Sequence, residues 1–145
     1  MKILIDSNVL IDYVAVRTPY YEDAHKIMKL CSDKKVYGAI AVHSIPNIYF
    51  ILRKEMDDET RRKVLKNLLL VLDVAGYNRM SVIEALDKNN FKDFEDCLQD
   101  KCAESFRADY IVTRNVKDFV NSSVKAVTPT EFLEMELFGN AWDEG

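Results

Sequence analysis

The sequence predicts an α/β fold with a mostly parallel central sheet, and two observations support this. Short apolar runs rich in β-branched residues alternate along the chain with longer segments whose apolar residues recur at helical spacing. The first run, Ile3–Ile5, has no polar interruption, which is typical of a strand covered by helices on both faces. Because strands that alternate with helices form βαβ units, we expect the strands to be parallel.

The segments after the first strand are expected to alternate between helix and strand. Cap-forming residues after Asp6 and apolar residues up to Val14 predict a short helix. Thr18-Pro19 is typical of a helix start, since proline is favoured at the first helical position, and helical spacing then continues to Ser32. Gly38–His43 is predicted to be a second buried strand.

Three further helices and a brief strand are expected in the middle of the chain. Ser44 is a cap-forming residue before an apolar stripe that reaches Leu52, and a second stripe begins at about Thr60. Leu72–Ala75 predicts a third strand. Ser81–Glu84 has the spacing of a capping box, in which a serine and a glutamate bind each other's backbone amides, and it predicts a short helix.

The last third of the chain repeats the alternation. Asp93–Phe106 predicts a helix, and Asp109–Thr113 and Val124–Val127 predict a fourth and a fifth strand, separated by a polar loop at Arg114–Asp118. Thr128–Glu131 has helix-capping residues and begins a last helix that is expected to reach about residue 137. Right-handed crossovers would place the carboxyl ends of the first and fourth strands at one edge of the sheet.

Length and composition predict one globular domain over residues 1–138, with a flexible tail at 139–145. The chain has 145 residues, of which 48% are hydrophobic and 30% charged. No apolar run approaches the roughly 20 residues that cross a bilayer, and no signal-peptide pattern stands at the start, so we expect a cytoplasmic protein without a membrane partner. The three cysteines lack metal-site spacing and are expected to behave as small apolar residues.

The charge balance limits the classes of partner. A net charge of −4 and a pI near 5.2 argue against a broad basic surface for nucleic acid. An enzyme that meets phosphate groups through bound cations remains compatible with an acidic chain.

Acidic residues stand where a parallel sheet binds ligands. Asp6 directly follows the first strand, and the carboxyl ends of strands form the usual binding edge of such sheets. Asp6 could also simply cap the next helix. Asp93, Asp96 and Asp100 are spaced to share one helix face, where like charges repel by a few tenths of a kcal/mol per pair unless a cation lies between them. The alternative is a solvated acidic helix start, which the helix dipole favours.

A third polar group follows the fourth strand. Asn115 and Asp118 could each present an oxygen to the same edge, although an asparagine in a turn is the simpler interpretation. Each of these signals is weak alone, whereas their joint occurrence at one edge predicts a site with oxygen ligands. Such ligands suit Mg²⁺ or Mn²⁺.

Four motifs, in order along nearly the whole chain, resemble the PIN domain family. They are DSNVLID, DFEDCLQ, ADYIVTRNVKDF and TPTEF. The sequence is most similar to single-domain members grouped with VapC-type toxins. The resemblance implies a three-layer α/β/α fold and a Mg²⁺- or Mn²⁺-dependent ribonuclease acting on single-stranded RNA. It also suggests a homodimer and a small antitoxin as the protein partner.

The resemblance also assigns residues to the site. Asp6 matches the first acid of the family and Asp96 the third, and Asp93 lies one turn before Asp96, where it would assist. Ser7 matches the small hydroxyl residue that follows the first acid and supports it. Arg114, with Lys117, lies beside this site as a candidate phosphate contact.

Two positions depart from the pattern of the family. Asn47 stands where a glutamate is common, and Asn115 stands where the fourth acid usually falls, with Asp118 close behind as a substitute. The site therefore loses two formal negative charges unless Asp93 and Asp118 compensate, and amide oxygens ligate Mg²⁺ more weakly than carboxylates.

The predicted mechanism is metal-assisted phosphodiester hydrolysis. Asp6 and Asp96 would hold the ion, and Asp93 or Asp118 would orient the attacking water or a second ion. By resemblance, the products would carry a 5′-phosphate and a 3′-hydroxyl. The alternative function is a catalytically degenerate PIN-like module that binds nucleic acid or a partner protein. A phosphoacceptor or phosphatase domain matches less well, because such domains need paired acids where DSN has one.

Overall fold

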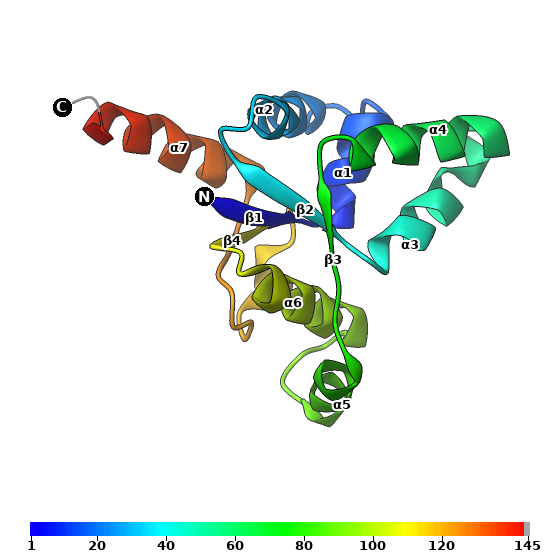
Figure 1. Cartoon of the computed structure of the whole chain (residues 1–145), viewed down its shortest axis with the longest axis vertical. Helices are drawn as coiled ribbons and strands as arrows, with labels where there is room; N and C mark the ends of the chain where they lie inside the picture. Colours follow the sequence, from blue (N-terminus) through cyan, green and yellow to red (C-terminus); the bar gives the residue numbers. More distant parts are fainter. Residues whose placement is uncertain (144–145) are drawn as a thin grey trace.

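Five parallel strands form one sheet in the order β3-β2-β1-β4-β5 (Figure 1). The structure is a computed structural model that describes residues 1–143 and the side chains of residues 1–136. The strands are β1 (Lys2–Ile5), β2 (Tyr37–Ala41), β3 (Asp73–Ala75), β4 (Tyr110–Val112) and β5 (Ala126–Val127). The predicted α/β class and the parallel sheet are therefore confirmed.

Helices cover both faces of the sheet. They are α1 (Ser7–Val14), α2 (Tyr21–Ser32), α3 (Ser44–Ile51), α4 (Asp58–Leu69), α5 (Arg79–Asp87), α6 (Phe94–Phe106) and α7 (Pro129–Asp143), with short 3-10 turns η1 (Leu52–Lys54) and η2 (Val116–Phe119). Figure 1 shows α1 and α2 on one side of the sheet and α6 on the other. The arrangement is the expected three-layer α/β/α fold.

The core alternates along β1. Ile3 and Ile5 pack into one apolar cluster, under α1 and α2, while Leu4 packs into a second cluster, under α6. All three side chains are fully buried. Successive residues of a strand point to opposite faces, so this central strand needs apolar residues without interruption.

The position of β1 between β2 and β4 determines where its carboxyl end lies. Ile5 pairs with Val112 in the register of β1 and β4, and the amide of Asp6 donates to the carbonyl oxygen of Val112 at 2.9 Å. Asp6 therefore lies at the centre of the carboxyl edge, beside the ends of the two neighbouring strands.

Three helix starts differ from the prediction. Ser44, the expected cap, is the first residue of α3, and His43 occupies the N-cap position. The Thr18-Pro19 peptide is cis and α2 begins only at Tyr21, so proline precedes the helix and does not open it. The capping box predicted at Ser81–Glu84 is also wrong. Asn78 caps α5 and accepts a hydrogen bond from the amide of Ser81 at 2.9 Å, which leaves Ser81 inside the helix. Asn78, three residues earlier, is therefore the N-cap of this helix.

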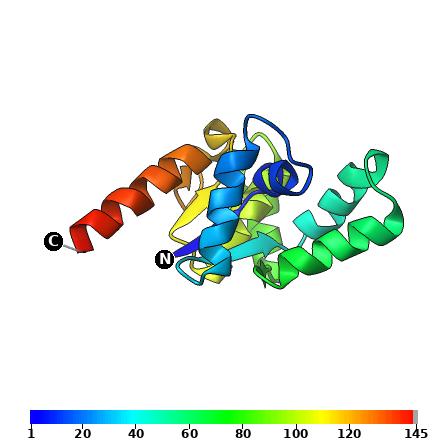
Figure 2. The same cartoon turned by 90° about the horizontal axis from the view of Figure 1, so that it is seen from above.

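Helices α3 and α4 lie side by side at the end of the molecule opposite α7 (Figure 2). None of the helices within residues 1–143 has both the length and the apolar character needed to cross a membrane. Cys31, Cys97 and Cys102 are buried free thiols in or beside the apolar clusters, as expected. Residues 144 and 145 of the predicted tail lie outside the described residues, and the division at residue 138 stays a prediction.

Candidate active site

Asp6 combines the two roles that its sequence position left open. It is the N-cap of α1, and its Oδ1 accepts hydrogen bonds from the amide of Ser7 and from Nε2 of Gln99, both at 2.7 Å. Its Oδ2 accepts from the hydroxyl of Thr113 at 2.8 Å. Contacts from α1, α6 and the end of β4 thus hold this carboxylate in one orientation.

A buried polar network supports Asp6. The hydroxyl of Ser7 donates to that of Ser44 at 2.8 Å, and Nε2 of Gln99 lies 3.4 Å from the same Ser44 oxygen. Ser44, Thr113 and Gln99 are almost fully buried. Among the described side chains, Oε1 of Gln99 has no hydrogen-bond partner, which is costly for a buried acceptor.

Asp96 lies within electrostatic reach of the other candidate acids. Its pKa is raised to about 7, first by burial and then by the negative charges of Asp93, Asp6, Asp118 and Glu95. The pKa of Asp6 is also raised, mainly by burial, with a contribution from the charge of Glu95. The fold therefore brings acids that are about 90 to 110 positions apart in sequence to one side of the molecule.

Glu95 is the acid that the sequence prediction missed. Its Oε1 accepts a hydrogen bond from Nδ2 of Asn47 at 2.5 Å, which links the first turns of α3 and α6. Gln99 was missed as well. Its spacing was a usable signal, because it lies three residues after Asp96 and thus on the same side of α6.

The three aspartates Asp93, Asp96 and Asp100, at the start of α6 and within it, have different roles. Asp93 is the N-cap and accepts from the amide of Glu95 at 2.7 Å. Asp100 is fully buried and accepts from the backbone amides of Ser123 and Val124 at 2.8 and 3.0 Å. Asp100 therefore fastens the chain before β5 to α6, and the expectation that it shares an acidic face with Asp93 and Asp96 is wrong.

The segment after β4 borders the site. Nε of Arg114 donates to Oδ2 of Asp12 at 2.7 Å, and the guanidinium carbon lies 4.1 Å from the ring centre of Tyr20. The backbone amide of Asn115 donates to the hydroxyl of Thr113 at 3.0 Å, while the Asn115 side chain is exposed. Lys117 is exposed on η2. Of the two predicted phosphate contacts, only Lys117 has a side chain without an ionic partner among the described residues.

His43 is half-buried near the same edge. Neither ring nitrogen has a hydrogen-bond partner within the described residues, and the ring lies 5.8 Å from that of Tyr77. Burial lowers the pKa of His43, and the nearby charge of Asp6 partly opposes this. A neutral imidazole beside the acids is the result.

The donor types fit a hard divalent cation, although no ready-made cage is present. Within the described part of the chain, no three His, Cys, Asp or Glu side chains converge closely enough to hold a metal ion. The donors near Asp6 are carboxylate and amide oxygens, which suit Mg²⁺ or Mn²⁺. Oε1 of Gln99, which has no partner among the described side chains, and the negative charges around the half-buried Asp96 are both features that a cation would stabilise.

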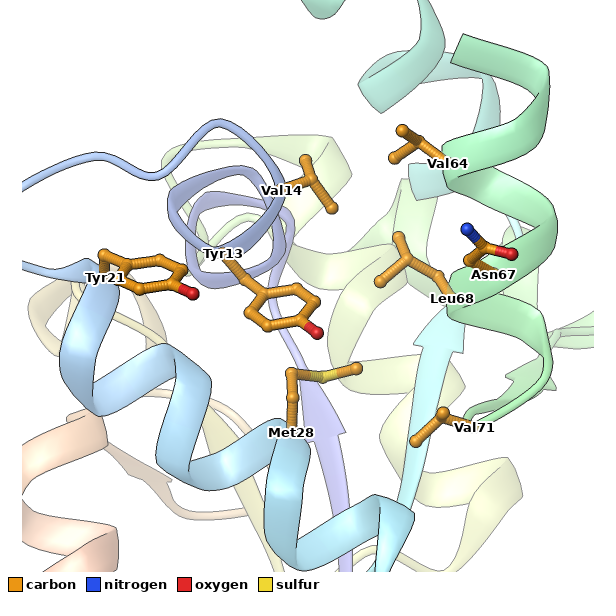
Figure 3. A pocket seen from close by; sticks show the side chains of 8 residues that line it. All are labelled: Tyr13, Val14, Tyr21, Met28, Val64, Asn67, Leu68 and Val71. Carbon is orange, nitrogen blue, oxygen red and sulfur yellow. The ribbon is translucent and has the colours of Figure 1, made fainter. Parts of the chain in front are cut away.

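A separate apolar groove of about 280 Å³ lies between α1, α2 and α4 (Figure 3). The residues that line it are Tyr13, Val14, Tyr21, Met28, Val64, Asn67, Leu68 and Val71. The rings of Tyr13 and Tyr21 stack at its edge, with centres 6.2 Å apart. This surface is distinct from the acids in both position and chemistry.

The comparison with family models decides the family. The model described as "PIN domain" matches residues 2–117, which is most of the chain and includes every candidate acid except Asp118. The chain belongs to the PIN domain family. None of the curated proteins compared with it by sequence gives a match.

Solved structures show the same PIN fold at low sequence identity. A chain of VapBC2 from Rickettsia felis, bound to a fragment of promoter DNA, has a TM-score of 0.65 and 18% identity over 88% of this chain and 98% of that one. A chain of DNA-bound VapBC from Salmonella typhimurium has a TM-score of 0.68 and 17% identity, over 89% of this chain and 98% of that one. A chain of a toxin–antitoxin complex from Klebsiella pneumoniae has a TM-score of 0.64 and 20% identity, over 87% of this chain and 96% of that one.

Proposed function

We propose that this PIN domain is a Mg²⁺- or Mn²⁺-dependent endoribonuclease of the toxin–antitoxin type that hydrolyses single-stranded RNA. The observation that carries the proposal is the gathering of acids around the half-buried Asp96, on which the charges of Asp93, Asp6, Asp118 and Glu95 all act. Acids gathered at such an edge suit a cation and, through it, a phosphate.

Asp6 and Asp96 would hold the ion, which would neutralise charge on the attacked phosphate and make a nearby water more acidic. Gln99 and Thr113 keep the Asp6 carboxylate from rotating. Asp118, or Asp93 with the oxygen not used as a cap, would accept a proton from the attacking water. Cleavage would leave a 5′-phosphate and a 3′-hydroxyl.

Lys117 is the better candidate for direct contact with an RNA phosphate, because its ammonium group is exposed on η2. Arg114 would act from its ion pair with Asp12, using the nitrogens that Asp12 leaves free.

The test is cleavage of end-labelled single-stranded RNA in Mn²⁺ and in EDTA. Asp96→Asn and Asp118→Asn should each reduce cleavage, for Asp96→Asn by about 100-fold or more, since transition-state charge stabilisation by a metal is worth several kcal/mol. The control is Asp87→Asn at the exposed end of α5, which should cleave as wild type does. Undiminished cleavage by Asp96→Asn would refute the assignment.

Asp6→Asn should abolish cleavage too, but it needs a fold check. The new amide group would face donors from Ser7, Gln99 and Thr113, so it loses hydrogen bonds that the carboxylate accepts. Circular dichroism and the melting temperature of that variant separate a loss of chemistry from a loss of structure.

A small antitoxin is the proposed protein partner, with the groove of Figure 3 as its binding surface. An apolar groove between helices suits an amphipathic helix. Val64→Glu should abolish co-elution with the product of the adjacent reading frame and leave RNA cleavage intact. Lys63→Glu, an exposed neighbour on α4, is the matched control and should retain binding. We also propose a homodimer, which light scattering during size-exclusion chromatography tests.

A degenerate PIN module that binds RNA without cutting it is the second candidate. Asn47 and Asn115 favour it, because each presents an amide where the family resemblance implies an acid. This function predicts an RNA affinity that neither EDTA nor Asp96→Asn changes, together with no cleavage in Mn²⁺.

A further inference from the structure

Glu95 and Asn47 form a contact that joins α6 to α3 at the edge of the acid cluster. We propose that Glu95 is a ligand of the divalent cation, and that Asn47 is a positioning residue that directs its carboxylate toward Asp6 and Asp96. The inference rests on the proposed function, because it assigns a further residue to the same cation site.

The hydrogen bond between Asn47 and Glu95 fixes one carboxylate oxygen, and the other has no hydrogen-bond partner among the described side chains. Nδ2 of Asn47 donates to Oε1 of Glu95 at 2.5 Å, and the two residues are 48 positions apart in sequence. An amide donor is well suited to this task because it orients a carboxylate without neutralising it, whereas a lysine or an arginine would neutralise the charge. Oε2 of Glu95 is thereby available to a cation.

Glu95 has no ionic partner among the described residues, although several acids elsewhere on the molecule have one. Glu84 pairs with Lys101, Glu55 with Arg17 and Asp58 with Arg62, whereas no lysine or arginine pairs with Glu95 within residues 1–136. The same holds there for Asp6 and Asp96. A carboxylate left unneutralised beside two others is unfavourable unless a cation binds among them.

The negative charge of Glu95 acts on both Asp6 and Asp96. It contributes to the raised pKa of Asp6 and to that of Asp96. Glu95 therefore lies within electrostatic range of the carboxylate at the end of β1 and of the one beside it in the first turn of α6, although within the described residues these acids do not already converge into a metal cage.

Gln99 supplies an independent indication of a missing ligand. Its side chain is 2% exposed, its Nε2 is bound to Asp6, and its Oε1 has no partner among the described side chains. A buried acceptor next to the acids is satisfied by a cation or by a water that the cation orders.

A purely structural role for Glu95 makes a different prediction. An acid in the first turn of a helix interacts favourably with the helix dipole, and its removal then affects only the melting temperature. Glu59 offers a matched control, because it is the second residue of α4 as Glu95 is the second residue of α6, and it is exposed.

The experiment is calorimetric titration of the full chain with Mn²⁺, without RNA. Glu95→Gln should weaken Mn²⁺ binding by about tenfold or more, and Asn47→Ala by a smaller factor, since ligand charge and its positioning both set affinity. The double variant should bind no more weakly than Glu95→Gln, because Asn47 acts through Glu95. Glu59→Gln should bind as wild type does.

The outcomes separate this inference from the proposed function. If Asp96→Asn loses Mn²⁺ binding while Glu95→Gln stays within twofold of wild type, the ligand role of Glu95 is wrong and the nuclease proposal stands. If the wild-type chain binds no Mn²⁺, both are wrong. If Asn47→Ala and Glu95→Gln weaken binding additively, Asn47 does not act through Glu95 and its positioning role is wrong.

Discussion

Arg114 forms an ion pair with Asp12, whose residue surface is only 1% exposed, through an Nε–Oδ2 hydrogen bond of 2.7 Å. The pair fastens the loop after β4 to α1, and the guanidinium also covers the ring of Tyr20. Arg114 is therefore part of the framework that holds the site as well as a candidate phosphate contact.

Arg114→Ala is expected to lower the free energy of unfolding by about 3 kcal/mol, because it leaves a buried carboxylate unpaired. Urea denaturation followed by circular dichroism measures this. The double variant Asp12→Asn/Arg114→Ala should recover part of the loss. Equal losses in the single and the double variant would contradict the explanation.

Asp96 should make the cation-free protein less stable as pH rises. Its folded pKa, about 7, lies above its ordinary value of 3.8, so between about pH 4 and 7 the folded state binds more protons than the unfolded state. The stabilisation that this group contributes to the folded state is fully present below about pH 4 and is lost as the pH rises through about 7. The loss is on the order of 1–2 kcal/mol after allowance for solvent screening.

The pH effect is isolated by comparing melting temperatures of wild type and Asp96→Asn in EDTA. Asp96→Asn should raise the melting temperature at pH 8 relative to wild type and change it little at pH 4. An equal change at both pH values would show that the charge of Asp96 does not destabilise the fold.

Mn²⁺ binding should release protons, because the ion competes with the proton on Asp96. At pH 7, about half of the Asp96 carboxyls are protonated, so we expect release of about 0.5 proton per ion from this group. Calorimetry in two buffers with different ionisation enthalpies measures the number. Binding that is equally tight at pH 6 and pH 8 would contradict the prediction.

Asp100→Asn should destabilise the fold and leave Mn²⁺ binding unchanged. The buried carboxylate accepts from two backbone amides, and an asparagine would turn its own donor toward one of them. The expected cost is about 2 kcal/mol in denaturant unfolding. A weakened Mn²⁺ affinity in this variant would place Asp100 in the acid cluster after all.

Much of the fold could be predicted from the sequence because it depends on local patterns. Ile3–Ile5 is apolar on both faces, and this indicated a central strand and thus the position of Asp6. The helix at Asp93–Phe106 had a capping residue and an apolar stripe, so its start was predicted to within one residue. Both signals lie within a few residues of the element that they specify.

The contacts within the site depend on more than local pattern. Asn47 meets Glu95, and Gln99 meets Asp6, across separations of 48 and 93 residues, and the rotamers that allow this follow from packing between elements. No periodicity of a single sequence encodes such a contact. Asn78 displaced the predicted cap at Ser81 for a related reason, since the path of the chain leaving β3 decides between two suitable caps.

The pairing of β1 with β4 has a consequence for synthesis of the chain. The amide of Asp6 binds the carbonyl of Val112, and the Asp6 side chain binds Thr113. The first strand therefore gains these contacts only after residues more than a hundred positions later have been synthesised. A nascent or truncated chain that stops before Tyr110 therefore lacks the strand and the Thr113 hydroxyl that orient Asp6. The strand order therefore delays formation of the site until nearly the whole polypeptide has been made.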